Sequence, residues 1–217
     1  MKGILFKPEM IQAIIGRRKT QTRRVIKPQP PDGYHSPIHI LDGAYGFQKP
    51  SQGHPPFLAR PPYRAGETVY IKEAYCPECY KIDGIEDACY RIDEDDLEST
   101  PTPIDCLQLK WESPLFMPQW AARYFIVILD VKAQRLQEIT NEDIVAEGVL
   151  RGEFKCNPGF PNAVAWRYHD GGEYWGQSGV PVFQRLWDSV NPKYPFDSNP
   201  WVFVYEFKAT LGDRRDK

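Results

Sequence analysis

The clearest hydrophobic pattern near the start of the chain lies directly before a run of basic residues. Apolar side chains at Met10, Ile11, Ile14 and Ile15 recur at the spacing of a short helix that packs one face on a core. Residues 20–26 are rich in β-branched side chains, which favours a strand. The pattern therefore predicts a helix, a junction and a strand, with the basic residues gathered at the junction.

Other apolar segments predict a protein made mainly of strands with a few short helices. Segments 68–75, 121–131 and 200–207 are rich in β-branched and aromatic residues, and each predicts a strand. Residues 182–190 have amphipathic spacing and predict a helix that ends before Pro192. We therefore expect a fold of the α+β class.

Three long segments between these elements lack a clear period. The first, 28–64, is dense in proline and glycine, and we expect a long surface loop there. The second, 76–110, is an acidic insertion, and the third, 151–180, is a loop rich in glycine and aromatic residues. We expect one domain, 1–217, that carries these three segments.

The sequence around residue 140 predicts a short, well-capped helix. Thr140 is a natural N-cap, Asp143 occupies the capping-box position, and Gly148 can end the helix in a left-handed conformation. Glu147 then lies in the last turn, where a carboxylate opposes the helix dipole. Glu147 is either an ordinary surface glutamate or a carboxylate held toward a basic site.

Composition and charge narrow the possible classes of protein. Hydrophobic residues make up 41% of the 217 residues, which excludes global disorder. No apolar run approaches the roughly 20 residues of a membrane-spanning helix, and the apolar stretch at 4–6 is too short for a secretory signal. We therefore expect a cytoplasmic protein without a membrane partner.

The net charge of −2 conceals a strong asymmetry along the chain. Residues 1–27 hold eight Lys or Arg and one Glu, whereas residues 76–106 hold ten Asp or Glu and two Lys or Arg. The distribution, rather than the overall charge, is what bears on nucleic-acid binding.

The basic junction, residues 16–24, contains five cationic and three hydrogen-bonding side chains. A solvated basic turn is the ordinary interpretation of such a run. However, Thr20 and Thr22 alternate with Lys19, Gln21 and Arg23, so one face of a strand carries hydroxyls and the other mainly cations. That arrangement suits an anionic, hydrogen-bonding ligand such as a nucleotide.

This junction resembles the signature of the ASCH domain family, Gly-x-Lys-x-x-Glu-x-Arg. Lys19 matches the family lysine and Arg24 the closing arginine, while Thr22 stands where the family usually has glutamate and Arg17 where it has glycine. ASCH domains belong to the PUA-like superfamily. The resemblance therefore implies a mainly antiparallel PUA-like β-barrel with short peripheral helices and long loops.

Further segments look like phage-encoded members of the same family. These are the helix end at 186–191 and the strand at 199–202. The resemblance covers 4–27, 65–75, 111–149 and 182–208, and it leaves the loops between them uncovered.

Threonine at the usual glutamate position is similar to bacterial ASCH amidohydrolases that act on N4-acetylcytidine, in which a lysine, a threonine and a glutamate are catalytic. The resemblance implies these roles for Lys19, Thr22 and Glu147, and it implies a modified nucleoside or RNA as the partner. Arg24, together with Arg23 and Thr20, is then expected to bind the substrate. We expect no cofactor and no metal at this site.

The chemistry of amide hydrolysis fits these three residue types. Thr22 can act as a nucleophile if a neighbouring base takes its proton, and Lys19 can be that base if burial and nearby cations lower its pKa. Glu147 can relay a proton to the leaving amine. Because side chains alternate along a strand, Lys19 and Thr22 converge only if the chain bends near residues 19–20.

Several alternatives remain open at this point. The junction can belong to a binding module for RNA or a modified base, with no chemistry. It can also belong to a ribonuclease or to a protein of phage assembly. Each residue also has a purely structural interpretation: Lys19 binds phosphate, Thr22 fills a strand position and Glu147 pairs with an arginine.

The cysteines offer a separate possibility. Cys76 and Cys79 form a C-x2-C pair, and Cys89 and Cys106 can complete a four-thiolate zinc site. The spacings that follow, of nine and sixteen residues, are irregular. Buried or free thiols are therefore the default interpretation, and zinc is the alternative.

Overall fold

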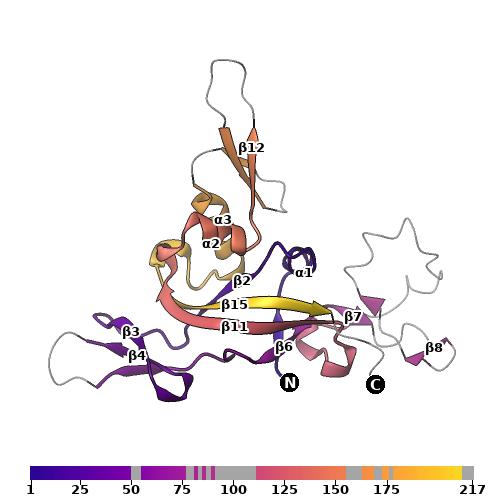
Figure 1. Cartoon of the computed structure of the whole chain (residues 1–217), viewed down its shortest axis with the longest axis horizontal. Coiled ribbons are helices and arrows are strands. Elements are labelled where there is room, and N and C mark those ends of the chain that lie inside the picture. Colours follow the sequence, from indigo (N-terminus) through magenta and orange to yellow (C-terminus); the bar gives the residue numbers. More distant parts are fainter. Residues whose placement is uncertain are drawn as a thin grey trace. The chain divides into compact units, whose positions relative to one another are not determined.

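A computed structural model describes residues 1–49, 55–76, 81–82, 85–86, 89–90, 111–154, 163–168, 173–175 and 178–211 (Figure 1). The chain forms two compact units. The first comprises Met1–Gly16, Thr68–Val127 and Lys208–Lys217, and the second comprises Arg17–Glu67 and Ile128–Phe207. The expectation of a single domain stays a prediction.

The first unit is built on a short sheet with an apolar interior. Strand β1 (Gly3–Leu5) pairs in parallel with β6 (Thr68–Lys72), which pairs antiparallel with the start of β11 (Tyr124–Arg135). Helix α1 (Pro8–Ile15) begins with proline in its first turn, where the missing N–H is tolerated. Of the predicted apolar stripe, Ile11 and Ile14 are buried, whereas Met10 is partly buried and Ile15 is 39% exposed, so the buried face is narrower than predicted.

Shorter elements complete the first unit. Strand β7 (Tyr75–Cys76) pairs with β10 (Cys89–Tyr90), and β8 (Lys81–Ile82) pairs with β9 (Ile85–Glu86). Two 3-10 turns follow, η4 (Pro114–Phe116) and η5 (Gln119–Ala121). Most of the predicted acidic insertion, 76–110, lies outside the described residues.

The second unit contains the antiparallel strands that carry the basic junction. Strand β2 (Gln21–Val25) pairs with β15 (Trp201–Leu211), with Thr22 opposite Tyr205. Strand β15 also neighbours β11. The two run antiparallel, because one contact joins Phe125 to Thr210 and another joins Lys132, seven residues later in β11, to Glu206, four residues earlier in β15.

Two helices of the second unit follow the predicted signals. Helix α2 spans Asn141–Ala146, and the Thr140 side chain accepts a hydrogen bond from the Asp143 backbone N–H in a complete capping box. Gly148 follows the helix with a φ of 97°, the left-handed conformation predicted for it. Helix α3 spans Val180–Val190. The short 3-10 turns of this unit are η1 (Leu41–Gly43), η6 (Leu136–Glu138) and η7 (Phe196–Ser198).

The prediction of a continuous loop at 28–64 is wrong. This segment holds an antiparallel sheet of β3 (His35–His39), β4 (Tyr45–Gln48) and β5 (Phe57–Ala59). Pro37 lies in the edge strand β3, where the missing N–H breaks no central ladder. The proline and glycine residues of this segment lie largely in the turns between short strands, which is why their density alone does not indicate a continuous loop.

The segment 151–180 is likewise not loop throughout. Strands β12 (Leu150–Phe154), β13 (Ala163–Arg167) and β14 (Glu173–Trp175) form an antiparallel sheet. Its strands are short and rich in aromatic residues, and they lack the length over which a period becomes visible.

The fold is α+β, with mainly antiparallel sheets and few helices, which confirms the predicted class. The main strand order is β1-β6-β11-β15-β2, and it has two ends among the described residues, so these strands form an open sheet. No helix in the described ranges is both long enough and apolar enough to cross a membrane.

Candidate functional site

Backbone hydrogen bonds hold the basic junction between α2 and β15. The Thr20 N–H donates to the Ala146 carbonyl at 2.8 Å, and the Phe207 N–H donates to the Thr20 carbonyl at 2.9 Å. Lys19 and Glu147 face each other in an isolated antiparallel bridge. The start of β2 is therefore tied to the end of α2, which places the side chains of Lys19 and Glu147 close together.

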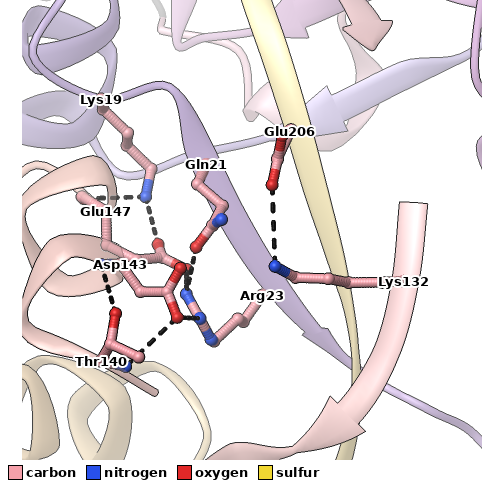
Figure 2. Close-up of polar contacts among 8 residues, drawn as sticks. All are labelled: Lys19, Gln21, Arg23, Lys132, Thr140, Asp143, Glu147 and Glu206. Carbon is pink, nitrogen blue, oxygen red and sulfur yellow. Dashed lines mark hydrogen bonds and ion pairs between the residues drawn. The ribbon is translucent and has the colours of Figure 1, made fainter. Parts of the chain in front are cut away.

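The Lys19 amine makes two contacts with Glu147. Its Nζ lies 2.5 Å from Glu147 Oε2, and it donates to the Glu147 backbone carbonyl at 2.9 Å (Figure 2). The side chain of Lys19 is 0% exposed and that of Glu147 is 5% exposed. Of the two interpretations of Glu147, the structure supports the carboxylate held toward the basic junction.

Arg23 contacts the other oxygen of the same carboxylate. Its NH1 donates to Glu147 Oε1 at 3.0 Å and to Gln21 Oε1 at 2.6 Å. Its NH2 lies 2.8 Å from Asp143 Oδ2. The five residues Lys19, Gln21, Arg23, Asp143 and Glu147 therefore form one connected polar cluster, shown in Figure 2 and called the β2–α2 cluster below.

Burial and charge shift the ionisation of two members of this cluster. Burial lowers the pKa of the Lys19 amine from its ordinary 10.5, Glu147 partly opposes this, and Arg24 and Arg23 lower it further. For Asp143, burial alone acts to raise the pKa, but Arg23, the Thr140 N–H and other partners outweigh it and hold the pKa below its ordinary 3.8. The cluster therefore combines an amine whose pKa is lowered by burial with a carboxylate whose pKa is held below its ordinary value.

The structure brings two of the three predicted catalytic residues into direct contact, namely Lys19 and Glu147. Thr22 lies within β2 and is 4% exposed. Because side chains alternate along a strand, Thr22 points to the face opposite Gln21 and Arg23, toward the side of its cross-strand partner Tyr205. The catalytic role of each residue stays a prediction.

The three predicted substrate-binding residues lie in different surroundings. The Arg23 side chain is 0% exposed and forms ion pairs with the carboxylates of Asp143 and Glu147. Arg24 is partly buried. Burial lowers its pKa, and Tyr63, Glu147 and Tyr205 partly oppose this. Thr20 is exposed next to the cluster. Thr20 is therefore the one of the three whose side chain is exposed.

The turn before β2 contains the residue that departs from the family signature. Arg17 has a φ of 58°, in the left-handed region that favours glycine. This is the position at which the ASCH signature has glycine. The backbone at residue 17 thus has a conformation that glycine adopts without strain and arginine does not.

Sequence reasoning missed two members of the cluster, Gln21 and Asp143. The sequence predicts only the capping role of Asp143, which it fulfils while it also contacts Arg23. A signal for its second role was available. Asp143 and Glu147 are four residues apart, a spacing that places two carboxylates on one side of a helix end.

The four-thiolate zinc site, the alternative to free or buried thiols, is not tested by the described residues. Cys76 is a buried free thiol, and β7 and β10 pair so that Cys76 lies opposite Cys89. Cys79 and Cys106 lie outside the described residues. Within the described ranges there is no group of three or more His, Cys, Asp or Glu arranged to hold a metal ion.

Comparisons with protein-family models, curated proteins and solved structures gave no match.

Proposed function

We propose that this chain is an ASCH-type amidohydrolase that acts on N4-acylated cytidine, or on a related modified nucleoside, free or within RNA. On this proposal the main sheet is part of a PUA-like fold. The observation that carries the proposal is the buried contact between Lys19 Nζ and Glu147 Oε2, at 2.5 Å. It joins the amine and the carboxylate that the resemblance assigns to catalysis.

The properties of this pair suit proton transfer. A lysine amine accepts a proton only in its neutral form, and the lowered pKa of Lys19 increases the share of that form near neutral pH. A neutral amine keeps two N–H bonds, one for the Glu147 carboxylate and one for the Glu147 backbone carbonyl, and has a lone pair that can accept a proton. Glu147 then stabilises the ammonium that forms when Lys19 takes a proton.

The proposed reaction is the hydrolysis of an amide. An oxygen nucleophile bonds to the acyl carbon, and its hydrogen passes to the Lys19 amine. The bond from the acyl carbon to N4 breaks, and a proton returns to N4, which releases cytidine. If the nucleophile is Thr22, water then hydrolyses the acyl ester; if it is water, the carboxylic acid forms directly.

The position of Thr22 makes water a real competitor for the nucleophile. Thr22 lies on the face of β2 opposite Gln21 and Arg23, whereas Lys19 contacts Glu147 on their face. Replacement of Thr22 by alanine distinguishes the two routes. A Thr22 nucleophile predicts loss of turnover, and a water nucleophile predicts turnover that persists.

A binding-only function is the second candidate, and exposed cations favour it. Arg17 and Arg18 are exposed at the junction, in contrast to the buried Lys19 and Arg23. Such side chains suit contacts with RNA phosphates, and binding would then weaken steeply as salt rises. This function requires no proton transfer by Lys19, which separates it from the first proposal.

The experiment is to incubate the protein with N4-acetylcytidine and measure cytidine by chromatography. We expect release by the wild type, and a loss of at least about 100-fold in Lys19→Ala and in Glu147→Ala, the lower range for a lost proton-transfer group. Glu142→Ala, on the exposed side of α2, is the matched control and retains turnover.

A second arm uses an RNA oligonucleotide that carries one N4-acetylcytidine. Release of acetate with the strand intact supports the amidohydrolase on a polymer, and strand cleavage supports the ribonuclease alternative. If the folded wild type deacetylates neither the nucleoside nor the RNA, the amidohydrolase proposal is wrong.

A further inference from the structure

Arg23 and Lys19 contact different oxygens of the Glu147 carboxylate. Arg23 NH1 donates to Oε1, and Lys19 Nζ lies against Oε2. We propose that Arg23 is a positioning residue, which fixes the Glu147 carboxylate against Lys19 and places its own charge beside the lysine amine. This inference rests on the proposed function, because it concerns how the same pair is prepared for proton transfer.

The planar guanidinium matches two carboxylates at once. Asp143 and Glu147 lie four residues apart at the end of α2, and Arg23 reaches Asp143 Oδ2 with NH2 and Glu147 Oε1 with NH1. Two separate nitrogens of one rigid plane fix both the distance and the orientation of the carboxylates. A lysine at this position carries the same charge on a single atom and cannot hold both in this way.

Three elements hold the guanidinium itself. From β2, Gln21 Oε1 accepts from NH1 at 2.6 Å. From α2 come the two carboxylates, and from α3 the ring of Phe183 lies with its centroid 6.0 Å from the central guanidinium carbon. The Arg23 side chain is 0% exposed. Its position is therefore set by the fold, and water does not screen its charge.

Charged groups from each neighbouring element act on this cluster. Glu147 raises the pKa of the Lys19 amine, whereas burial, Arg24 and Arg23 lower it. Lys132 of β11 lowers the pKa of Asp143, and the Lys132 amine lies 3.7 Å from the carboxylate of Glu206 in β15. The phenols of Tyr63 and Tyr205 raise the pKa of Arg24. Loss of the Arg23 charge therefore shifts the Lys19 pKa upward.

The test compares Arg23→Gln, which removes the charge, with Arg23→Lys, which keeps the charge and removes the fork. Arg64→Gln is the control, because Arg64 is exposed in the same unit and the net charge changes equally. For each folded protein, the ¹³Cε chemical shift of Lys19 is followed against pH by NMR. The kcat and KM for N4-acetylcytidine are measured in parallel.

We expect Arg23→Gln to move the Lys19 titration to higher pH, and Arg64→Gln to leave it in place. Arg23→Lys is expected to leave the titration close to that of the wild type while kcat falls and KM stays similar. An unchanged Lys19 titration in Arg23→Gln overturns the inference, and so does wild-type kcat in Arg23→Lys.

The titration is independent of turnover, so it separates this inference from the proposed function. A wild type without amidase activity refutes the function, and the Lys19 titration still decides the role of the Arg23 charge. If Arg23→Gln does not fold, Asp143→Asn takes its place, because it makes the cluster more positive. It is expected to move the Lys19 titration to lower pH, and a shift to higher pH or none overturns the inference.

Discussion

Lys19 and Glu147 are 128 residues apart in the chain and are joined twice, by the Lys19 amine to the Glu147 carboxylate and by the same amine to the Glu147 backbone carbonyl. The carbonyl contact involves backbone that no substitution of Glu147 removes. The carboxylate contact depends on the side chain alone. Substitutions at residue 147 therefore test the charge of the pair while part of its geometry remains.

Glu147→Gln is expected to destabilise the protein by about 3 kcal/mol, at the lower end of the range for removing one partner of a buried ion pair. The value is at the lower end because Arg23 keeps its contact with Asp143. Denaturant unfolding measures this loss. Glu142→Gln, on the exposed side of the same helix, is the control and should change stability by less than about 0.5 kcal/mol. Equal stability of the two variants would contradict the structural role of the Glu147 charge.

The lowered pKa of Lys19 predicts a specific dependence of stability on pH. Between its folded-state pKa and the ordinary 10.5, the unfolded chain binds more protons at this residue than the folded chain does. The contribution of Lys19 to the free energy of unfolding therefore rises as pH rises through this window. Lys19→Met lacks this contribution.

The measurement is urea unfolding of wild type and Lys19→Met from pH 7 to about 9, below the range in which tyrosines titrate. Burial raises the pKa of Tyr45 and of Tyr75, so those residues act in the opposite sense at higher pH. The stability of the wild type relative to the variant should increase across the window. A relative decrease would show that the Lys19 pKa is raised.

Local signals in the sequence predicted the elements that depend on a few neighbouring residues. Helix α2 was predicted with its cap because Thr140, Asp143 and Gly148 act within eight residues of one another. The three strands within 28–64 were missed because proline and glycine mark turns as well as loops. Strand pairing, which decides between the two, is not local.

In the candidate site, too, some features follow from the sequence and others depend on non-local contacts. The resemblance pointed to Lys19 and Glu147, and the fold brings these two together. The role of Arg23 as partner of both Asp143 and Glu147 was not foreseen, because it depends on which side of β2 meets α2. The separation of Thr22 from Arg23 by alternation along a strand was predicted from the sequence, and β2 (Gln21–Val25) has both residues within it.

Arg17→Gly is expected to stabilise the protein by about 0.5 to 1 kcal/mol, as measured by thermal or denaturant unfolding. Arg17 has a φ of 58°, which is strained for a side chain with a Cβ and free of strain for glycine. The greater freedom of glycine in the unfolded chain offsets part of the gain. Arg18→Gly, next to it and outside the left-handed region, is the control and should destabilise. Destabilisation of both variants to the same extent would contradict this account of the turn.

The central claim is that Lys19 transfers a proton, and Lys19→Arg tests it most directly. Arginine keeps a positive charge beside Glu147 but stays protonated at any pH at which the protein is folded. Single-turnover release of cytidine from N4-acetylcytidine should fall at least about 100-fold in the folded variant. Release at the wild-type rate would show that Lys19 supplies only charge, and would contradict the proposed mechanism.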